Sequence, residues 1–289
     1  MGFFGVVASP WDIDEWEAAT GIRADFPMVF EKWSRERTIE GHFAKALSAG
    51  YSRLMVTWEP WESVPIGTPS EEQGALQLKW SNDSIAGGYH DAYIRSWAET
   101  IRDSGLEMVY IRFAHEMNGH WYPWHNNPEG YVAAWRRIRS VFKKASCANA
   151  RFIWAPNANL YQDKPKWLSS VLPYWPGADH VHFTGLTAIN FGPPRDYSPS
   201  QFTSRFSLLR NVFGKSVGAV EMNCAYETRE RWLTDFAAVV LGQSLNFVVL
   251  SQQESRGAAA METGEMNWSV TNDLVGLNAL KVVVDALKR

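Results

Sequence analysis

The stretch Met108-Val109-Tyr110-Ile111-Arg112-Phe113 decides the fold, because it is apolar along nearly its whole length. A continuous apolar run of this size is typical of a strand that is buried on both faces, as in parallel sheets. Downstream of it, Tyr131, Trp135, Ile138 and Phe142 recur at helical spacing and form one apolar stripe. The two patterns together predict a buried strand followed by a helix that packs on it.

The same unit recurs along the chain, although the letters themselves do not repeat. Eight short apolar runs alternate with segments of helical period, at residues 3–8, 27–30, 53–57, 108–113, 151–155, 181–189, 217–220 and 245–250. Eight strand–helix units in 289 residues are typical of an α/β protein that forms a (β/α)8 TIM barrel. Since no linker rich in Pro, Gly or Ser divides the chain, we expect a single domain over residues 1–289.

Composition excludes several classes of function. The chain has 28 Lys and Arg against 31 Asp and Glu, a net charge of -3, so it lacks the basic excess that holds nucleic acid. No apolar run reaches the ~18 residues that a membrane helix needs. Cys147 and Cys224 fall at opposite ends of the predicted barrel, so we expect two unpaired thiols. No spacing of metal-ligand type is present, and we expect neither a metal nor a cofactor.

The residues that follow the strands point to a function. In a (β/α)8 barrel these residues share the C-terminal face, where active sites lie. Here they include carboxylates, amides and several of the 15 tryptophans. Amides and carboxylates bind sugar hydroxyls, and aromatic faces stack on sugar rings, so the combination predicts a polysaccharide cleft. The candidate substrate-binding residues are His115, Trp58, Glu59, Trp61, Arg112, Asn118, Trp121, Trp124, Asn157, Asn190, Asn223 and Gln252.

Two strand-end glutamates are the candidates for catalysis. Glu116 follows the fourth strand and Glu221 follows the seventh. Glycosidic hydrolysis needs one carboxylic acid to protonate the leaving oxygen and a second carboxylate to attack or to activate water. Either residue alone is more often a salt-bridge or capping partner, but the pair in an aromatic mouth favours catalysis. Glu254 is a reserve candidate, and the loop of residues 59–88 is long enough to be functional.

Several motifs resemble glycoside hydrolase family 26, the β-mannanase and mixed-linkage β-glucanase family of retaining (β/α)8 enzymes. The most specific is the stretch Arg112-Phe113-Ala114-His115-Glu116-Met117-Asn118-Gly119-His120-Trp121-Tyr122-Pro123-Trp124, and residues 56–61, 85–91 and 153–157 add to it. The resemblance covers nearly the whole chain. It implies that Glu116 is the acid/base, that Glu221 is the nucleophile, and that Trp121 is an aromatic wall near the cleavage point. Retention of configuration then predicts carboxyl groups ~5–5.5 Å apart.

The nucleophile side departs from the family pattern. Ile189 stands where the family commonly has a tyrosine whose hydroxyl holds the nucleophile. Where a tryptophan usually ends strand eight, this chain has Leu250-Ser251-Gln252-Gln253. We therefore expect an amide of Asn190, Asn223 or Gln252 to contact the Glu221 carboxylate, directly or through one water.

These observations predict a retaining endo-β-glycosidase that hydrolyses a β-mannan, a mixed-linkage β-glucan or a bacterial exopolysaccharide without a cofactor. The alternative is a barrel that binds polysaccharide and no longer cleaves it; a lyase or transglycosidase has no specific support. We expect a monomer with no nucleic-acid or membrane partner. We also expect a secreted or cell-envelope protein whose leader is absent from this chain, with a cytoplasmic location as the alternative.

Overall fold

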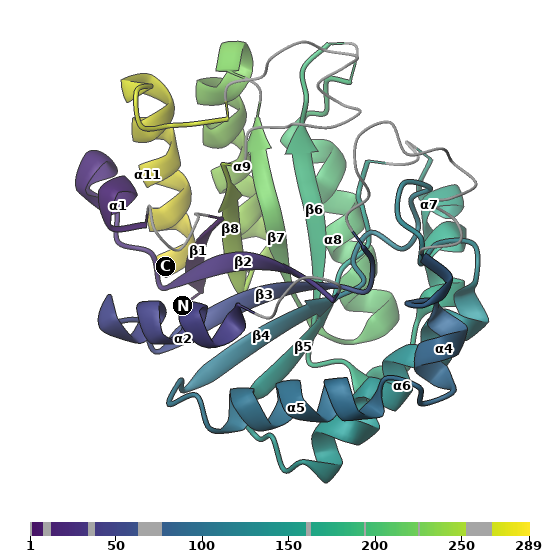
Figure 1. Ribbon diagram of the computed structural model, residues 1–289. Helices are drawn as coiled ribbons and strands as arrows, with labels where there is room; N and C mark the ends of the chain where they lie inside the picture. Colours follow the sequence, from purple (N-terminus) through teal and green to yellow (C-terminus); the bar gives the residue numbers. More distant parts are fainter. Residues whose placement is uncertain are drawn as a thin grey trace, which may run out of the picture. The chain divides into compact units, whose positions relative to one another are not determined.

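The eight strands of the computed structural model follow one another in chain order around a closed barrel (Figure 1). The structure describes residues 2–7, 13–33, 38–62, 77–159, 163–193, 195–224, 226–252 and 268–289. The strands are β1 (Phe3–Val7), β2 (Phe26–Lys32), β3 (Arg53–Glu59), β4 (Met108–Phe113), β5 (Ala150–Trp154), β6 (Phe183–Asn190), β7 (Ser216–Cys224) and β8 (Phe247–Ser251). Each overlaps one predicted run, which confirms the prediction of a (β/α)8 barrel.

Helices connect the strands, as the barrel pattern requires. The α-helices are α1 (Ile13–Thr20), α2 (Ile39–Ser48), α4 (Asn82–Ala86), α5 (Asp91–Arg102), α6 (Pro128–Lys144), α7 (Lys164–Val171), α8 (Pro199–Phe213), α9 (Arg229–Gln243) and α11 (Leu274–Lys288). The short 3-10 turns are η1 (Leu172–Tyr174), η2 (Ala178–His180) and η3 (Tyr226–Thr228). None of these described helices combines the length and the apolar character needed to cross a membrane.

The sequence marks the helix ends. The Asn127 side chain accepts a hydrogen bond from the Gly130 amide and so caps α6, whose first residue is Pro128. Ser198 and Gln201 form a reciprocal capping box at the start of α8. The same helix stops at Gly214, whose φ of 66° lies in the left-handed region that glycine adopts without strain.

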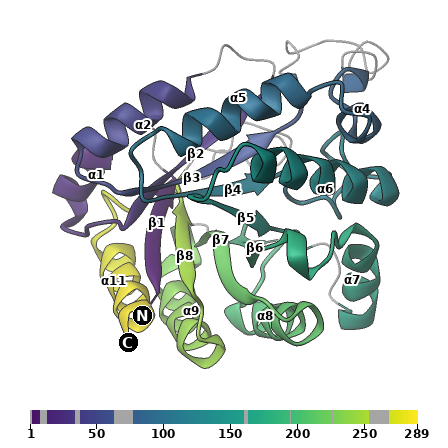
Figure 2. The same ribbon diagram turned by 90° about the horizontal axis from the view of Figure 1, so that it is seen from below.

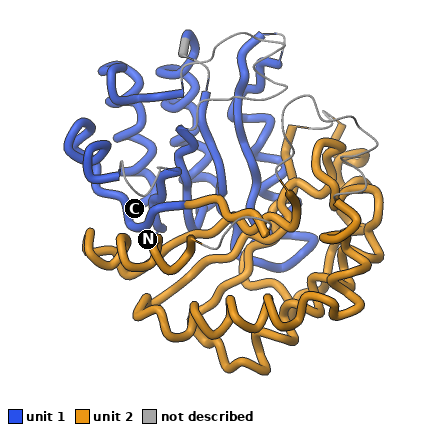
Figure 3. The backbone as a smooth tube through the Cα atoms, in the orientation of Figure 1, with its two compact units in different colours: residues 1–28, 184–289 blue, residues 29–183 orange. Residues whose placement is uncertain are grey.

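The chain divides into two compact units, Met1–Met28 with Thr184–Arg289, and Val29–Phe183 (Figure 3). We refer to them as unit 1 and unit 2. The expectation of a single domain stays a prediction. Both cysteines are free thiols, which confirms that expectation: Cys224 is buried in unit 1, and Cys147 is half-buried in unit 2.

In unit 1, β1 is flanked by parallel partners on both sides. Gly5 is in register with Phe26 of β2 and with Val249 of β8. A side chain at Gly5 would collide with the ring of Phe26, because an added Cβ would lie 2.3 Å from the nearest ring carbon. Helices α8, α9 and α11 lie side by side along this unit (Figure 2).

In unit 2, β3, β4 and β5 form a parallel ladder. The register of β3 and β4 runs from Arg53 opposite Met108 to Trp58 opposite Phe113. Glu59 and the residues after Phe113 therefore lie at the same end of the ladder. Helices α5 and α6 contact each other and belong to the same unit (Figure 2).

Trp58 corrects one expectation, because it belongs to the core and not to a cleft. Its side chain is fully buried. Its ring packs against Trp33 at 4.7 Å, against Trp97 of α5 at 5.0 Å and against Phe142 of α6 at 6.2 Å between centroids. Alternate strand residues point to opposite faces, and Trp58 faces the helices. Trp33 is buried in the same cluster.

We predict that Trp58→Ala lowers the free energy of unfolding by ~3–5 kcal/mol, the usual loss for a large aromatic core residue. Urea unfolding followed by tryptophan fluorescence measures it. Trp121→Ala is the matched control, since that side chain is 44% exposed, and we expect it to change stability by less than about 1 kcal/mol. Equal losses in the two variants would contradict the core assignment.

Candidate active site

The segment after β4 carries Glu116 in an unusual backbone conformation. Ala114 and Glu116 have φ values of 42° and 54°, in the left-handed region that few residues other than glycine adopt. The Glu116 amide donates to the carbonyl of Ala155 at 2.8 Å, and the Gly119 amide donates to the Glu116 carbonyl at 2.8 Å. Backbone strain of this kind is found at functional sites, where the surrounding structure enforces it.

The Asn118 side chain binds the backbone of Asn157 and holds this segment to the end of β5. The Asn118 amide nitrogen donates to the Asn157 carbonyl at 3.0 Å, and the Asn157 N–H donates to Asn118 Oδ1 at 2.8 Å. Trp167 Nε1 also donates to the Asn157 carbonyl at 2.8 Å. The Asn118 side chain is buried and both ends of its amide bind backbone, so it acts as a brace. Contact of Asn118 and Asn157 with a substrate stays a prediction.

Trp121 contacts the candidate acid directly. Its indole Nε1 donates to Glu116 Oε2 at 2.8 Å, although its ring is nearly half exposed. Gly119 makes room for the ring, because a Cβ at that position would lie 2.5 Å from Trp121 Cζ2. Trp121 is therefore both a hydrogen-bond donor to Glu116 and an exposed aromatic face beside it.

Three further aromatic rings surround His115 and Glu59. Tyr122 stacks on Trp124 with centroids 4.4 Å apart, and Trp61 meets Tyr122 edge-on at 5.7 Å. Trp124 is itself buried and donates from Nε1 to the His115 carbonyl at 2.7 Å, so its ring supports the others. Trp61 donates from Nε1 to Glu59 Oε2 at 3.1 Å. This aromatic cluster places Trp61 and Tyr122, both only partly buried, at the end of the β3–β4 ladder.

Arg112 and His115 lie beneath these rings. Arg112 is fully buried and donates to Thr57 Oγ1 at 3.3 Å, so it braces β4 against β3. Burial, reinforced by the Arg112 charge, holds the pKa of His115 well below its usual range. His115 is therefore a neutral imidazole at ordinary pH, and its Nδ1 is buried without a hydrogen-bond partner in the described residues.

In unit 1, Glu221 lies within β7 and is buried. Ser251, the last residue of β8, donates from Oγ to Glu221 Oε2 at 3.2 Å. A hydrogen bond to a carboxylate stabilises the ionised form, which is the form a nucleophile needs. Ser251 thus supplies the kind of donor that Ile189 lacks.

The expectation that an amide holds Glu221 is wrong for Asn190 and Asn223. Asn190 donates to Asp196 at 2.8 Å and to the Cys224 sulfur at 3.4 Å. Asn223 donates to the carbonyls of Ser251 and Trp268, and its own oxygen accepts from the Cys224 amide.

The hydrogen bond of the Gln252 side chain uses its oxygen: Oε1 accepts from the Val270 N–H at 3.2 Å. Sequence reasoning missed Ser251, and the available signal was its position at the end of the last strand. Glu254 and residues 63–76 of the long loop lie outside the described residues.

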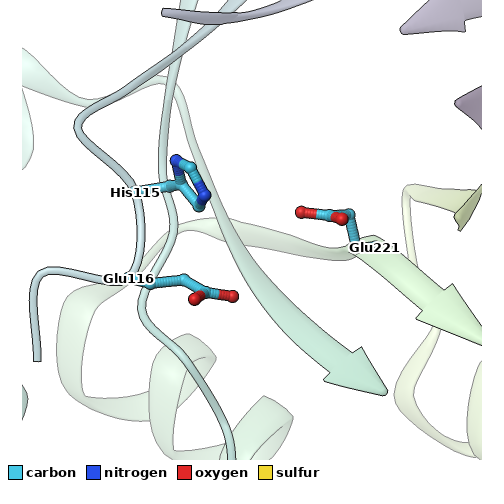
Figure 4. A group of neighbouring side chains, drawn as sticks. All are labelled: His115, Glu116 and Glu221. Atoms are coloured by element: carbon cyan, nitrogen blue, oxygen red, sulfur yellow. The ribbon is translucent and has the colours of Figure 1, made fainter. Parts of the chain in front are cut away.

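Figure 4 shows the two candidate glutamates and His115 with the elements that carry them: the segment after β4 for His115 and Glu116, and β7 for Glu221. His115 and Glu116 belong to unit 2 and Glu221 to unit 1. Side chains of these types can bind a metal ion. The same types suit acid–base chemistry. The contacts of Trp121 and Ser251 favour the second use, because each donates a hydrogen bond to a carboxylate oxygen.

Comparison with known proteins shows which family the chain resembles. The family model described as Glycosyl hydrolase family 26 matches residues 79–219, which include Glu116. The chain resembles this family. Endoglucanase H of Acetivibrio thermocellus is 24% identical over 98% of this chain. The mannan endo-1,4-beta-mannosidase A and B of Caldalkalibacillus mannanilyticus is 26% identical over 33% of this chain.

Solved structures show the same fold. A family 26 β-mannanase from Bacteroides ovatus superposes with a TM-score of 0.67 at 14% identity, covering 99% of this chain and 89% of that one. The chain spans 30% of the length of Endoglucanase H and 19% of the mannosidase. The matches support a glycoside hydrolase, and the motif around Glu116 lies in the matched region.

We predict that the buried, neutral His115 makes stability depend on pH. The unfolded state binds a proton near pH 6.5 and the folded state does not, so stability falls as the pH drops below about 6.5. Between pH 7.5 and 5.5 this residue accounts for a loss of up to about 1.4 kcal/mol. Urea unfolding of the wild type and of His115→Asn at both pH values measures it. The variant should lose less stability than the wild type, and an equal loss would contradict a neutral His115.

Proposed function

We propose that the chain is a retaining endo-β-glycosidase in which Glu116 is the acid/base and Glu221 the nucleophile. One observation carries the proposal: both glutamates are buried and accept a hydrogen bond from a neutral donor. Glu116, after β4, accepts from Trp121, and Glu221, within β7, accepts from Ser251.

The reaction has two steps. In the first, the Glu221 carboxylate attacks the anomeric carbon while the Glu116 carboxylic acid protonates the departing oxygen, which leaves a glycosyl ester on Glu221. In the second, the Glu116 carboxylate removes a proton from water, which attacks the same carbon and releases Glu221. Both steps need carboxyl groups ~5–5.5 Å apart, and that separation stays a prediction.

Trp121 and Ser251 assist different stages. The Trp121 N–H stabilises the ionised form of Glu116, which is the base in the second step. The Ser251 hydroxyl stabilises ionised Glu221 before attack and accommodates its return as leaving group. A neutral His115 next to Glu116 provides a polar ring without adding a charge that would lower the proton affinity of the acid.

The substrate we propose is a β-linked polysaccharide: β-mannan, mixed-linkage β-glucan or a bacterial exopolysaccharide. The exposed face of Trp121 and the partly buried rings of Trp61 and Tyr122 suit stacking on sugar rings. Glu59, which already accepts from Trp61, is an acceptor for sugar hydroxyls beside them. We further propose a monomer that acts outside the cytoplasm, where such polymers occur, with no nucleic-acid or membrane partner.

A barrel that binds polysaccharide without cleaving it is the second candidate. Ile189 favours it, because this side chain has no hydroxyl with which to hold the nucleophile. The Ser251 contact opposes it, since a donor to Glu221 is supplied from β8. Catalysis therefore has the stronger support.

Reaction of the two alanine variants with azide distinguishes the acid/base glutamate from the nucleophile. Glu116→Ala should lose ~10²–10⁴-fold activity on polysaccharide but keep activity on a dinitrophenyl β-glycoside, whose leaving group needs no proton. With azide it should yield the β-glycosyl azide. Glu221→Ala should be inactive alone and yield the α-glycosyl azide, because azide occupies the vacated face. NMR of the products distinguishes the two anomers.

Glu99→Ala, an exposed glutamate on α5, is the control and should behave like the wild type. If the wild-type protein releases no reducing ends from mannan, glucan or exopolysaccharides yet binds one of them, the binding-only barrel is correct. If Glu221→Ala keeps near-native activity, the nucleophile assignment is wrong.

We predict that Ser251→Ala lowers kcat by one to two orders of magnitude. The lost bond to a charged group is worth ~1.5–3 kcal/mol. Ser251→Thr keeps the hydroxyl and should restore the rate. A near-native kcat in Ser251→Ala would show that this serine does not position the nucleophile.

A further inference from the structure

A polar pocket lies in unit 2 at the start of β5, at the end of the strands opposite to Glu116. It has a volume of about 660 Å³. Arg136, Arg139 and Lys143 line it from one side of α6, and Arg151 lines it from β5. None of the candidate glycosidase residues lines it, so its role is separate from the proposed function.

The charge around this pocket is unbalanced. Its lining holds four basic side chains and a single acidic one, Asp179, in a chain whose net charge is -3. Burial and the neighbouring Arg151 charge lower the pKa of Arg139. Like charges gathered around a concave surface repel one another, and an anion within it removes that repulsion.

Cys147, which also lines the pocket, does not supply the missing negative charge. Burial raises the pKa of its thiol to about 11, so it is neutral at ordinary pH. Its sulfur lies 3.5 Å from Asn149 Oδ1, to which the thiol donates.

Arg139 and His182 present two donors to each other. The Phe152 amide donates to His182 Nδ1 at 2.8 Å, so in the neutral ring the proton is on Nε2. This Nε2 lies 3.5 Å from Nη2 of Arg139, and both residues line the pocket. One ligand oxygen between the two nitrogens accepts from both.

The Arg139 guanidinium also has a buried hydrogen-bond donor that no described residue satisfies. Its Nε is buried and has no hydrogen-bond partner among the described residues. The guanidinium carbon lies 4.6 Å from the centroid of the Phe152 ring, which fixes the plane of the group. A buried donor without a partner is unfavourable by ~1–3 kcal/mol, and an oxyanion would satisfy it.

The other two arginines are already held in place by backbone carbonyls. Arg136 donates from Nε to the Pro176 carbonyl at 2.8 Å, and Arg151 donates to the Ala148 carbonyl at 2.7 Å. Trp135 donates to the His180 carbonyl at 3.0 Å and thereby attaches η2 to α6. Arg136 and Arg151 are thus ordered before any ligand binds, which lowers the conformational entropy lost on binding.

We propose that this pocket is a binding site for a tetrahedral oxyanion, a phosphate or sulfate group, held by Arg139 and His182 with Arg136, Lys143 and Arg151 around it. Arginine presents a planar fork of donors that matches such oxygens. The group is either a free anion or the ester of a sugar.

Isothermal titration calorimetry of the full chain at pH 8 with orthophosphate tests the site. We expect saturable one-to-one binding with a Kd below about 1 mM in 0.15 M NaCl. Arg139→Gln should weaken it at least tenfold. Lys144→Gln removes the same charge from the same helix but outside the pocket, and should change Kd less than threefold.

Glucose 6-phosphate and inorganic sulfate, titrated in parallel, identify the source of the group. Tighter binding of the sugar phosphate than of orthophosphate assigns the pocket to an ester, and the reverse assigns it to a free anion. Lack of saturable binding by all three, or an equal loss in Arg139→Gln and Lys144→Gln, would overturn the proposal. Thermal unfolding of each variant verifies that the fold is intact.

Discussion

The hydrogen bond from the Glu116 amide to the Ala155 carbonyl fixes the chemistry of the β4 end. It holds Glu116 in a left-handed conformation that by itself is unfavourable by about 1–3 kcal/mol. Two bonds between the Asn118 side chain and the Asn157 backbone fasten the same turn, as does the bond from Trp124 to the His115 carbonyl. Because the turn is tied to β5, the Glu116 carboxyl group is held in one position, where it accepts a hydrogen bond from the Trp121 indole. The polar residues of the motif therefore serve mainly to place one carboxyl group.

The strands were predictable because parallel strands buried on both faces leave continuous apolar runs, which few other elements produce at this length. Two strands extend beyond the predicted runs at their C-terminal ends, where polar residues interrupt the apolar pattern. β3 extends to Glu59 and β7 to Cys224, so that Glu59 and Glu221 lie within the strands and not after them. A side chain at the mouth of a barrel is polar although its backbone continues the ladder, so hydrophobicity alone stops too early.

Two features were beyond sequence reasoning for a physical reason. In a strand buried on both faces, apolar character does not tell which residues face the helices, and Trp58 was therefore misplaced into a cleft. A strand end rich in amides and hydroxyls likewise does not tell which donor reaches a carboxylate. Asn190 was one of three candidates, but Asp196 and the Cys224 sulfur already take its two amide hydrogens. Which acceptor a strand-end amide binds depends on the loops that fold back onto the strand ends.

Ser251 and Asn223 show how the nucleophile side is organised without the tyrosine that Ile189 replaces. Asn223 donates to the Ser251 carbonyl at 2.5 Å and to the Trp268 carbonyl at 2.9 Å, so one amide ties β7 to the end of β8 and to the segment that follows. Ser251 in turn donates to Glu221, two residues before Asn223 on the same strand. Trp268 is buried and meets Phe191 edge-on at 5.7 Å, which anchors that segment against the end of β6. The hydroxyl that holds Glu221 is thus positioned by its own backbone carbonyl, and with its source on β8 the apolar Ile189 on β6 is compatible with an ionised nucleophile.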